Sequence, residues 1–245
     1  VIRVLIGQEN KARFRADGSK SIFVKGISSK QRSIKSFPRP SVFYYLVSYL
    51  FVLPIFRLLF RGFVLGDQNV PKRGPLVVVA NHGSHLDPPF LGHALGRPIS
   101  FMAKAELFNI PLIGFLIRAC GAYPVKRGSS DRQAIRVATN RLIEGWATGV
   151  FLDGTRQANG MVNNPMPGAA LLAARSGANL LPVAIVNSHR AFAKGSKFLR
   201  LLPIHLRIGE PIPPPVGRRK ADLEMTTREL QTRINFMLNT SSQKL

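Results

Sequence analysis

From residue 75 onward, short apolar runs alternate with longer segments of helical periodicity, and this alternation is the strongest constraint on the fold. The segments PPFLGHAL and DRQAIRVATNRLIEGWA are typical of the helical kind. The apolar runs predict strands at 75–80, 98–103, 121–125, 149–152 and 180–186, and an edge strand at 202–208. Strands that alternate with helices build a mostly parallel sheet flanked by helices. The predicted fold class is therefore α/β.

Polar residues follow four of these strands at the point where each strand ends. His82 follows the first, Lys104 the second, Arg127 the third, and Asp153 to Arg156 the fourth. In a parallel sheet the carboxyl ends of the strands lie at one edge, where open α/β sheets bind ligands. We therefore expect a histidine, a carboxylate and several cations to converge at that edge, although they are far apart in the sequence.

The segment NHGSHLD, residues 81–87, follows the first strand and contains two histidines and an aspartate. His82, His85 and Asp87 could supply three metal ligands, but the spacing of helical zinc sites and of loop-built metallohydrolases is absent. The remaining histidines of the chain are isolated from one another in the sequence. We therefore expect no metal at this segment.

The same segment can instead pair His82 with Asp87. Because Asp87 precedes Pro88, and proline suits the first turn of a helix, Asp87 is predicted to be an N-cap. Residues 81–86 then form a turn that folds His82 back towards it. A carboxylate that accepts from one imidazole nitrogen leaves the other nitrogen to take a proton, as in a general base. The alternative is a capping aspartate beside a histidine without a function.

The segment Val42 to Phe60 is apolar apart from Arg57, and 19 residues of helix are about as long as the hydrocarbon core of a bilayer is thick. Proline at position 54 predicts two short helices with a bend between them. We expect this segment to dock on a membrane, with Arg57 and Arg61 at the headgroups and with Tyr44, Tyr45 and Tyr49 at the interface. The alternative is a buried core helix followed by a linker.

The chain carries a formal net charge of +23, from 35 Lys and Arg residues against 12 Asp and Glu. A surface this basic attracts nucleic acid, anionic lipid or an acidic carrier protein. Residues 1–40 are basic and serine-rich and predict a flexible arm, with an organellar transit peptide as the alternative. No zinc-finger, helix-turn-helix or stacking pattern accompanies the charge, so a nucleic-acid-binding protein is only the non-enzyme alternative.

Four ordered blocks of the sequence resemble the glycerolipid acyltransferases, and among them most closely the 1-acylglycerol-3-phosphate (lysophosphatidate) acyltransferases. The blocks are N-H-x-S-x-x-D at 81–87, G-x-x-x-x-x-R at 121–127, F-x-D-G-T-R at 151–156 and L-P-V at 181–183. The resemblance covers about residues 42–210. Together with the charge and hydrophobicity of the chain, it predicts three parts: a basic arm at 1–40, a membrane-associated helical segment at 41–64 and an acyltransferase domain at 65–245.

The resemblance implies a role for each block. His82 would deprotonate the hydroxyl of the acceptor for attack on an acyl thioester, with Asp87 orienting it. The acceptor's phosphate would be held by cations and by a glycine-containing turn, which suit a phosphate monoester. These positions are Lys104, Arg127, Asp153, Gly154, Thr155 and Arg156. Asp153 stands where the family usually has glutamate, which leaves the identity of the acceptor open.

The resemblance also implies the substrates and the location. The acceptor would be lysophosphatidate, giving phosphatidate in phospholipid synthesis, with glycerol-3-phosphate or another lysolipid as alternatives. The donor would be acyl-CoA or acyl carrier protein, with no further cofactor. We expect an enzyme on the cytoplasmic face of an anionic membrane, either monotopic or with a single span.

Overall fold

The protein is represented by a computed structural model, which describes residues 42–125, 132–193 and 195–242. The predicted basic arm at 1–40 and the candidate residue Arg127 lie outside the described residues. The strands of the sheet are β1 (Phe63–Leu65), β2 (Leu76–Ala80), β3 (Ile99–Lys104), β4 (Tyr123–Val125), β5 (Ala147–Phe151), β6 (Asn179–Val186) and β7 (His205–Ile208).

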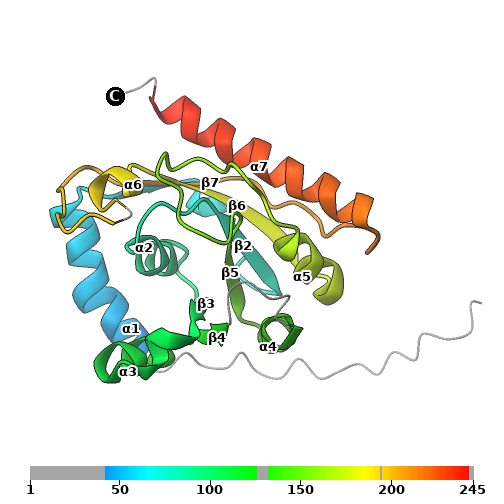
Figure 1. The fold of residues 1–245 in the computed structure, drawn as a ribbon, viewed down its shortest axis with the longest axis horizontal. Coiled ribbons are helices and arrows are strands. Elements are labelled where there is room, and N and C mark those ends of the chain that lie inside the picture. The colour runs from blue at the N-terminus through cyan, green and yellow to red at the C-terminus, as the bar shows by residue number, and fades with distance from the viewer. Residues whose placement is uncertain (1–41, 126–131, 194, 243–245) are drawn as a thin grey trace, which may run out of the picture. The chain divides into compact units, whose positions relative to one another are not determined.

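The helices lie between and beside these strands (Figure 1). One helix before the sheet consists of α1 (Val42–Leu46) and the π-helical turns η1 (Val47–Val52) and η2 (Ile55–Leu59). The others are α2 (Asp87–Ala94), α3 (Pro111–Ala119), α4 (Arg132–Ile143), α5 (Gly168–Ser176), α6 (Ser188–Ala191) and α7 (Lys220–Ser242), with short 3-10 turns η3 (Asp67–Asn69) and η4 (Ala105–Asn109).

Within the described residues the strands form one sheet in the order β1-β7-β6-β2-β5-β3-β4. From β6 to β4 all neighbours are parallel. The predicted mostly parallel sheet with flanking helices is confirmed. The expected edge position of 202–208 is wrong: β7 runs antiparallel to β6 and also pairs with β1, a three-residue strand that forms the edge. The sheet thus begins at Phe63, within the segment expected to be membrane-associated.

The strand β2 has two buried faces because helices cover both sides of the sheet. All five of its residues are fully buried. Successive side chains of a strand point to opposite faces. Val77 and Val79 accordingly join the core cluster with α4, α5 and α7, whereas Val78 lies in the other cluster with Phe56 and α2. This burial explains the run PLVVVA, which shows no alternation of polar and apolar residues.

The predicted bend at Pro54 is wrong, because the helix continues through it. Leu53 and Pro54 both have helical dihedral angles, with φ of −60° at each. On both sides the hydrogen bonds reach five residues back, from Leu53 to Ser48 and from Phe60 to Ile55. Such π-type turns shift the hydrogen-bond ladder at a point where proline has no N–H to donate.

The helix 42–59 buries only one of its sides. Tyr44 donates to the carbonyl of Gly92 at 3.1 Å, and Ser48 contacts His93 at 2.9 Å, both on α2. Tyr44 therefore packs inside the protein and does not lie at a bilayer interface, contrary to the expectation, while Tyr45 and Tyr49 are exposed. By length and composition alone the helix could cross a membrane.

We predict that Phe56→Ala lowers the free energy of unfolding by about 3–5 kcal/mol, because Phe56 is fully buried and its ring lies 5.0 Å from that of Phe90. The control is Leu58→Ala on the same helix, where the side chain is 77% exposed and a change below about 0.5 kcal/mol is expected. Urea unfolding followed by circular dichroism measures both. Equal stability of the two variants would contradict the packing of this helix on α2.

Candidate active site

The segment NHGSHLD connects the carboxyl end of β2 to α2 and is held against a second loop. That loop follows β5, which is the neighbour of β2 in the sheet. The amide of Gln157 in the second loop donates to the carbonyl of His82 at 2.8 Å. The ends of β2, β5 and β3 are therefore adjacent, and they bring His82, residues 153–156 and Lys104 to the same edge, as expected from the sequence.

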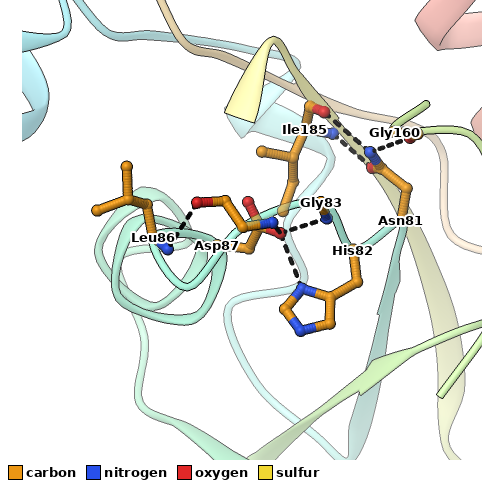
Figure 2. Close-up of polar contacts among 8 residues, drawn as sticks. Asn81, His82, Gly83, Leu86, Asp87, Gly160 and Ile185 are labelled. Atoms are coloured by element: carbon orange, nitrogen blue, oxygen red, sulfur yellow. Dashed lines mark hydrogen bonds and ion pairs between the residues drawn. The ribbon is translucent and has the colours of Figure 1, made fainter. Parts of the chain in front are cut away.

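His82 and Asp87 form the predicted contact across a turn. Nδ1 of His82 lies 2.8 Å from Oδ2 of Asp87 (Figure 2), and the Asp87 side chain is fully buried. Among the described residues, Nε2 of His82 has no hydrogen-bond partner, and 9% of the side chain is exposed. A carboxylate on one ring nitrogen fixes the tautomer and stabilises the imidazolium that forms when the other nitrogen takes a proton.

The predicted N-cap role of Asp87 is wrong. Asp87 is the first residue of α2, and its Oδ2 also accepts from the amides of Gly83 and Ser84, each at 2.8 Å. The carboxylate therefore points back into the turn, where two amide groups need an acceptor, and not forward along the helix. One oxygen atom fixes both the turn and the imidazole, so a change at Asp87 affects the two together.

The ring of Phe151 stacks on the imidazole of His82. The ring centroids are 3.9 Å apart and the planes differ by 14°. Phe101 lies almost parallel to Phe151 at 5.9 Å, and it fits there because Gly149 has no side chain to obstruct it. The imidazole is thus held by a hydrogen bond in its plane and by an aromatic ring against its face. Phe151 belongs to the third motif block of the sequence, but the motif alone indicates no role for it.

Asn81 joins three segments of the chain at the site (Figure 2). Its amide group donates to the carbonyls of Gly160 and Ile185 at 2.8 and 2.9 Å, and its oxygen accepts from the amide of Ile185 at 2.7 Å. It thereby fixes the end of β2 to β6 and to the second loop. Each of these bonds spans about 80 residues or more, so sequence spacing gave no signal for them.

Asp153 braces the second loop. The amide of Asn164 donates to one oxygen of its carboxylate at 2.7 Å, that of Asn163 to the other at 3.3 Å, and the residue is buried. Gly154 has a φ of +65°, a conformation that favours glycine, and Gly154 and Thr155 are exposed. The Asp153 carboxylate is therefore occupied by backbone amides, and the turn at Gly154 and Thr155 beside it is exposed to solvent.

Of the three candidate cations, two lie within the described residues. Lys104 ends β3 and is half exposed, with its Nζ 3.2 Å from Glu106. Arg156 is half-buried, and it has no ion-pair partner in the described part of the chain. A half-buried guanidinium without a carboxylate partner can bind an anionic ligand through two of its N–H groups.

The other polar residues of NHGSHLD have structural surroundings. The hydroxyl of the buried Ser84 accepts from the amide of Leu86 at 3.2 Å. It therefore stabilises the turn and is not placed as a nucleophile. His85 is exposed and its ring lies near Phe192. Over the described ranges, no three His, Cys, Asp or Glu side chains are gathered in a way that could hold a metal ion.

His189 on α6 packs against the two loops of the site at Gly83 and Gly160, a contact that the sequence did not indicate. A methyl group added to Gly83 would lie 2.6 Å from Cβ of His189, and one on Gly160 would overlap its ring. Burial lowers the pKa of this imidazole, and Arg190 lowers it further. The Asp87 carboxylate opposes this lowering of the pKa, and the His189 side chain packs against both loops. Glycine is required at both contacts for steric reasons.

Comparison with known proteins agrees with this geometry. A family model described as Acyltransferase matches residues 61–186, just over half of the 245 residues. The chain belongs to the acyltransferase family. The matched span of this acyltransferase includes both loops of the site and ends before α7, and it excludes the helix 42–59.

Several relatives of this chain have names that state an activity. A 1-acyl-sn-glycerol-3-phosphate acyltransferase of Borreliella burgdorferi is 27% identical over 151 residues, which are 59% of each chain. One from Bacillus subtilis is 30% identical over 61% of this chain and 72% of that protein. The chloroplastic LPAT1 of Arabidopsis thaliana is 30% identical over 54% of this chain and 38% of its own length.

The chain thus spans less than two thirds of the length of the Borreliella relative and well under half of the Arabidopsis one. Among solved structures, the crystal structure of the 1-acyl-sn-glycerophosphate (LPA) acyltransferase PlsC from Thermotoga maritima has a TM-score of 0.61. That likeness covers 78% of this chain and 91% of the other at 24% identity, and it shows a shared fold.

We predict that Phe151→Ala lowers kcat of acyl transfer by about 10- to 100-fold, because the imidazole loses the ring that fixes its plane. KM for the acyl donor should change little, since Phe151 contacts the histidine. Phe151→Tyr keeps the ring and should keep most of the activity. Steady-state kinetics of the three proteins test this, and a parental kcat in Phe151→Ala would contradict it.

Gly83→Ala is expected to reduce activity by about 100-fold, because the added methyl group meets His189 and displaces the turn that carries His82. Thermal unfolding should also show a loss of about 1–3 kcal/mol. Gly168→Ala is the matched control, since no atom lies within 4 Å of a methyl group at that position. A Gly83→Ala protein with normal activity would show that the turn tolerates displacement.

Proposed function

We propose that the protein transfers a fatty acyl group from an acyl thioester to the free hydroxyl of lysophosphatidate, giving phosphatidate in phospholipid synthesis. The observation that carries this proposal is the contact of His82 Nδ1 with the buried Asp87 carboxylate, with Nε2 left to take a proton. The names of the relatives from Borreliella burgdorferi and Bacillus subtilis support this choice of acceptor.

The proposed reaction needs one proton acceptor and no nucleophile from the protein. Nε2 of His82 takes the proton of the acceptor hydroxyl as its oxygen attacks the thioester carbonyl. The carbon–sulfur bond then breaks, and the thiolate leaves and is protonated by the imidazolium. Asp87 stays ionised and stabilises the imidazolium in between. The position of Ser84, whose hydroxyl accepts from the amide of Leu86, supports a direct transfer without an acyl-serine.

The acceptor's phosphate is proposed to lie at the exposed turn after β5. Arg156 is half-buried and without an acidic partner among the described residues, and Gly154 and Thr155 are exposed beside it. Lys104 ends the neighbouring strand β3 and can add a second charge. Arg127 belongs to the same proposal on the sequence alone. Asp153 then acts by holding this turn, through the amides of Asn163 and Asn164.

The donor in this proposal is acyl-CoA or an acyl carrier protein, and the lipid acceptor places the enzyme at a membrane. The helix 42–59 supports membrane association, because most of its apolar side chains are exposed. The proposed location is the cytoplasmic face of this membrane, as the resemblance implies. An anionic surface would suit the net charge of +23.

The experiment is an acyl-transfer assay of the full chain with lysophosphatidate, glycerol-3-phosphate and another lysolipid, each with acyl-CoA and with acyl carrier protein. His82→Ala should lower kcat with lysophosphatidate by at least about 10²- to 10⁴-fold, because the general base is lost. Its membrane binding should remain unchanged.

The matched control is His85→Ala, a histidine of the same segment that is exposed and whose ring lies near Phe192. It should keep near-parental activity. Full activity of His82→Ala would remove the proposed mechanism, and turnover only with glycerol-3-phosphate would replace the proposed acceptor.

A further inference from the structure

The helix α3 exposes nearly all of its apolar side chains, which is unusual for a helix of a folded domain. Leu112 is 77% exposed and Phe115 59%, with Ile113 and Leu116 above 40%. The only residue of α3 that is buried is Gly114, which rests against the backbone of Phe108 in η4. The helix is thus attached by its smallest residue and presents its large ones outward.

The exposed face of α3 continues into that of the helix 42–59. Phe43 and Phe115 are in edge-to-face contact with ring centroids 5.6 Å apart, and α1 and α3 lie side by side in Figure 1. The exposed side chains of the helix 42–59 include Leu50 and Phe51 at 62% and Leu58 at 77%. Together the two helices form one surface, which we call the two-helix apolar surface.

The charges on this surface are all positive. Arg57 is the single charged residue of 42–59, and Arg118 is the single one of 111–119. Arg118 donates to the carbonyl of Phe108 at 2.8 Å and lies over the Phe108 ring, so its charge stays beside the apolar side chains. Exposed tyrosines at positions 45 and 49 complete the pattern. Apolar side chains bordered by tyrosine and arginine suit an anionic phospholipid bilayer.

We propose that α3 is a second membrane-inserting element, which enters an anionic phospholipid bilayer beside the helix 42–59 and turns the carboxyl edge of the sheet towards the lipid. This rests on the proposed function and deepens it. α3 follows β3 through η4, and β3 ends at Lys104 on the edge that carries His82. The helix 42–59 packs on α2, whose first residue is Asp87.

Both helices of the surface are therefore attached to elements that begin or end at the catalytic edge. A lysolipid could then bring its hydroxyl to His82 while its acyl chain stays in the bilayer. A single docking helix would leave the domain able to rotate about that helix. A second contact at α3 removes this freedom and fixes which edge faces the membrane.

The deciding experiment measures the depth of α3 in vesicles of phosphatidylcholine and phosphatidylglycerol. Leu112→Trp places a tryptophan on α3 in the full chain. The control is Met225→Trp on α7, because Met225 is 69% exposed and is not part of the two-helix apolar surface. The added fluorescence of Leu112→Trp should shift to the blue and be quenched by lipids with brominated chains. That of Met225→Trp should do neither.

A second pair of variants tests the consequence for turnover. Leu112→Ser with Phe115→Ser should raise KM for lysophosphatidate in vesicles by at least about tenfold, because apolar burial that positions the domain is lost. Activity on a short-chain acceptor dissolved in water should stay at the parental level. Met225→Ser with Phe236→Ser on α7 removes similar exposed area and should change neither value.

Two outcomes would overturn the proposal. One is a Leu112→Trp emission that vesicles do not shift or quench. The other is a lipid-free dimer, seen by sedimentation, that Leu112→Ser with Phe115→Ser converts to a monomer, since the surface would then join two copies of the chain. The quenching experiment needs no turnover, so a failure of the proposed acyl transfer would be seen separately from a failure of this inference.

Discussion

The strand β2 is buried on both faces and along its whole length, and the rest of the site depends on it. A strand in that position has neighbours on either side and a core on either face, so its carboxyl end is fixed in space. Asn81 comes directly after β2, and His82 comes next. The Asn81 side chain connects the end of β2 to β6 and to the loop after β5. The imidazole therefore follows a strand that is held by neighbours on both sides and by a core on both faces, and such support suits a group whose proposed role requires a fixed position.

Asp87 carries out several tasks with one oxygen atom. Its Oδ2 accepts from the His82 ring and from two amides of the turn, and the other oxygen is buried. Phe151 then covers one face of the imidazole. The ring is held in its plane and against its face, and only Nε2 remains for chemistry. The turn that Asp87 holds passes close to His189, so there is no room for a side chain at Gly83.

The apolar helices and the catalytic edge belong to one arrangement. The helix 42–59 packs on α2 through Tyr44 and Ser48, and the short turn η4 connects α3 to the end of β3. Elements that would face a lipid are thus continuous with elements that hold His82. This continuity would matter for the proposed transfer to a membrane lipid, because an acceptor that stays in the bilayer has to reach His82 at a defined depth and orientation.

The sequence by itself determined the α/β class, the strands β2 to β7, the family and the pairing of His82 with Asp87. These depend on local periodicity and on residues close together in the chain. It gave no sign of the edge strand β1. It misplaced the region around 202–208, where β7 runs antiparallel inside the sheet, and it broke the helix at Pro54, where π-type hydrogen bonds carry it through. It also gave no role to Asn81, Phe151 or His189. Only the tertiary structure decided these, because each acts through contacts across tens of residues, and neither strand order nor the partner of a buried side chain can be derived from local spacing.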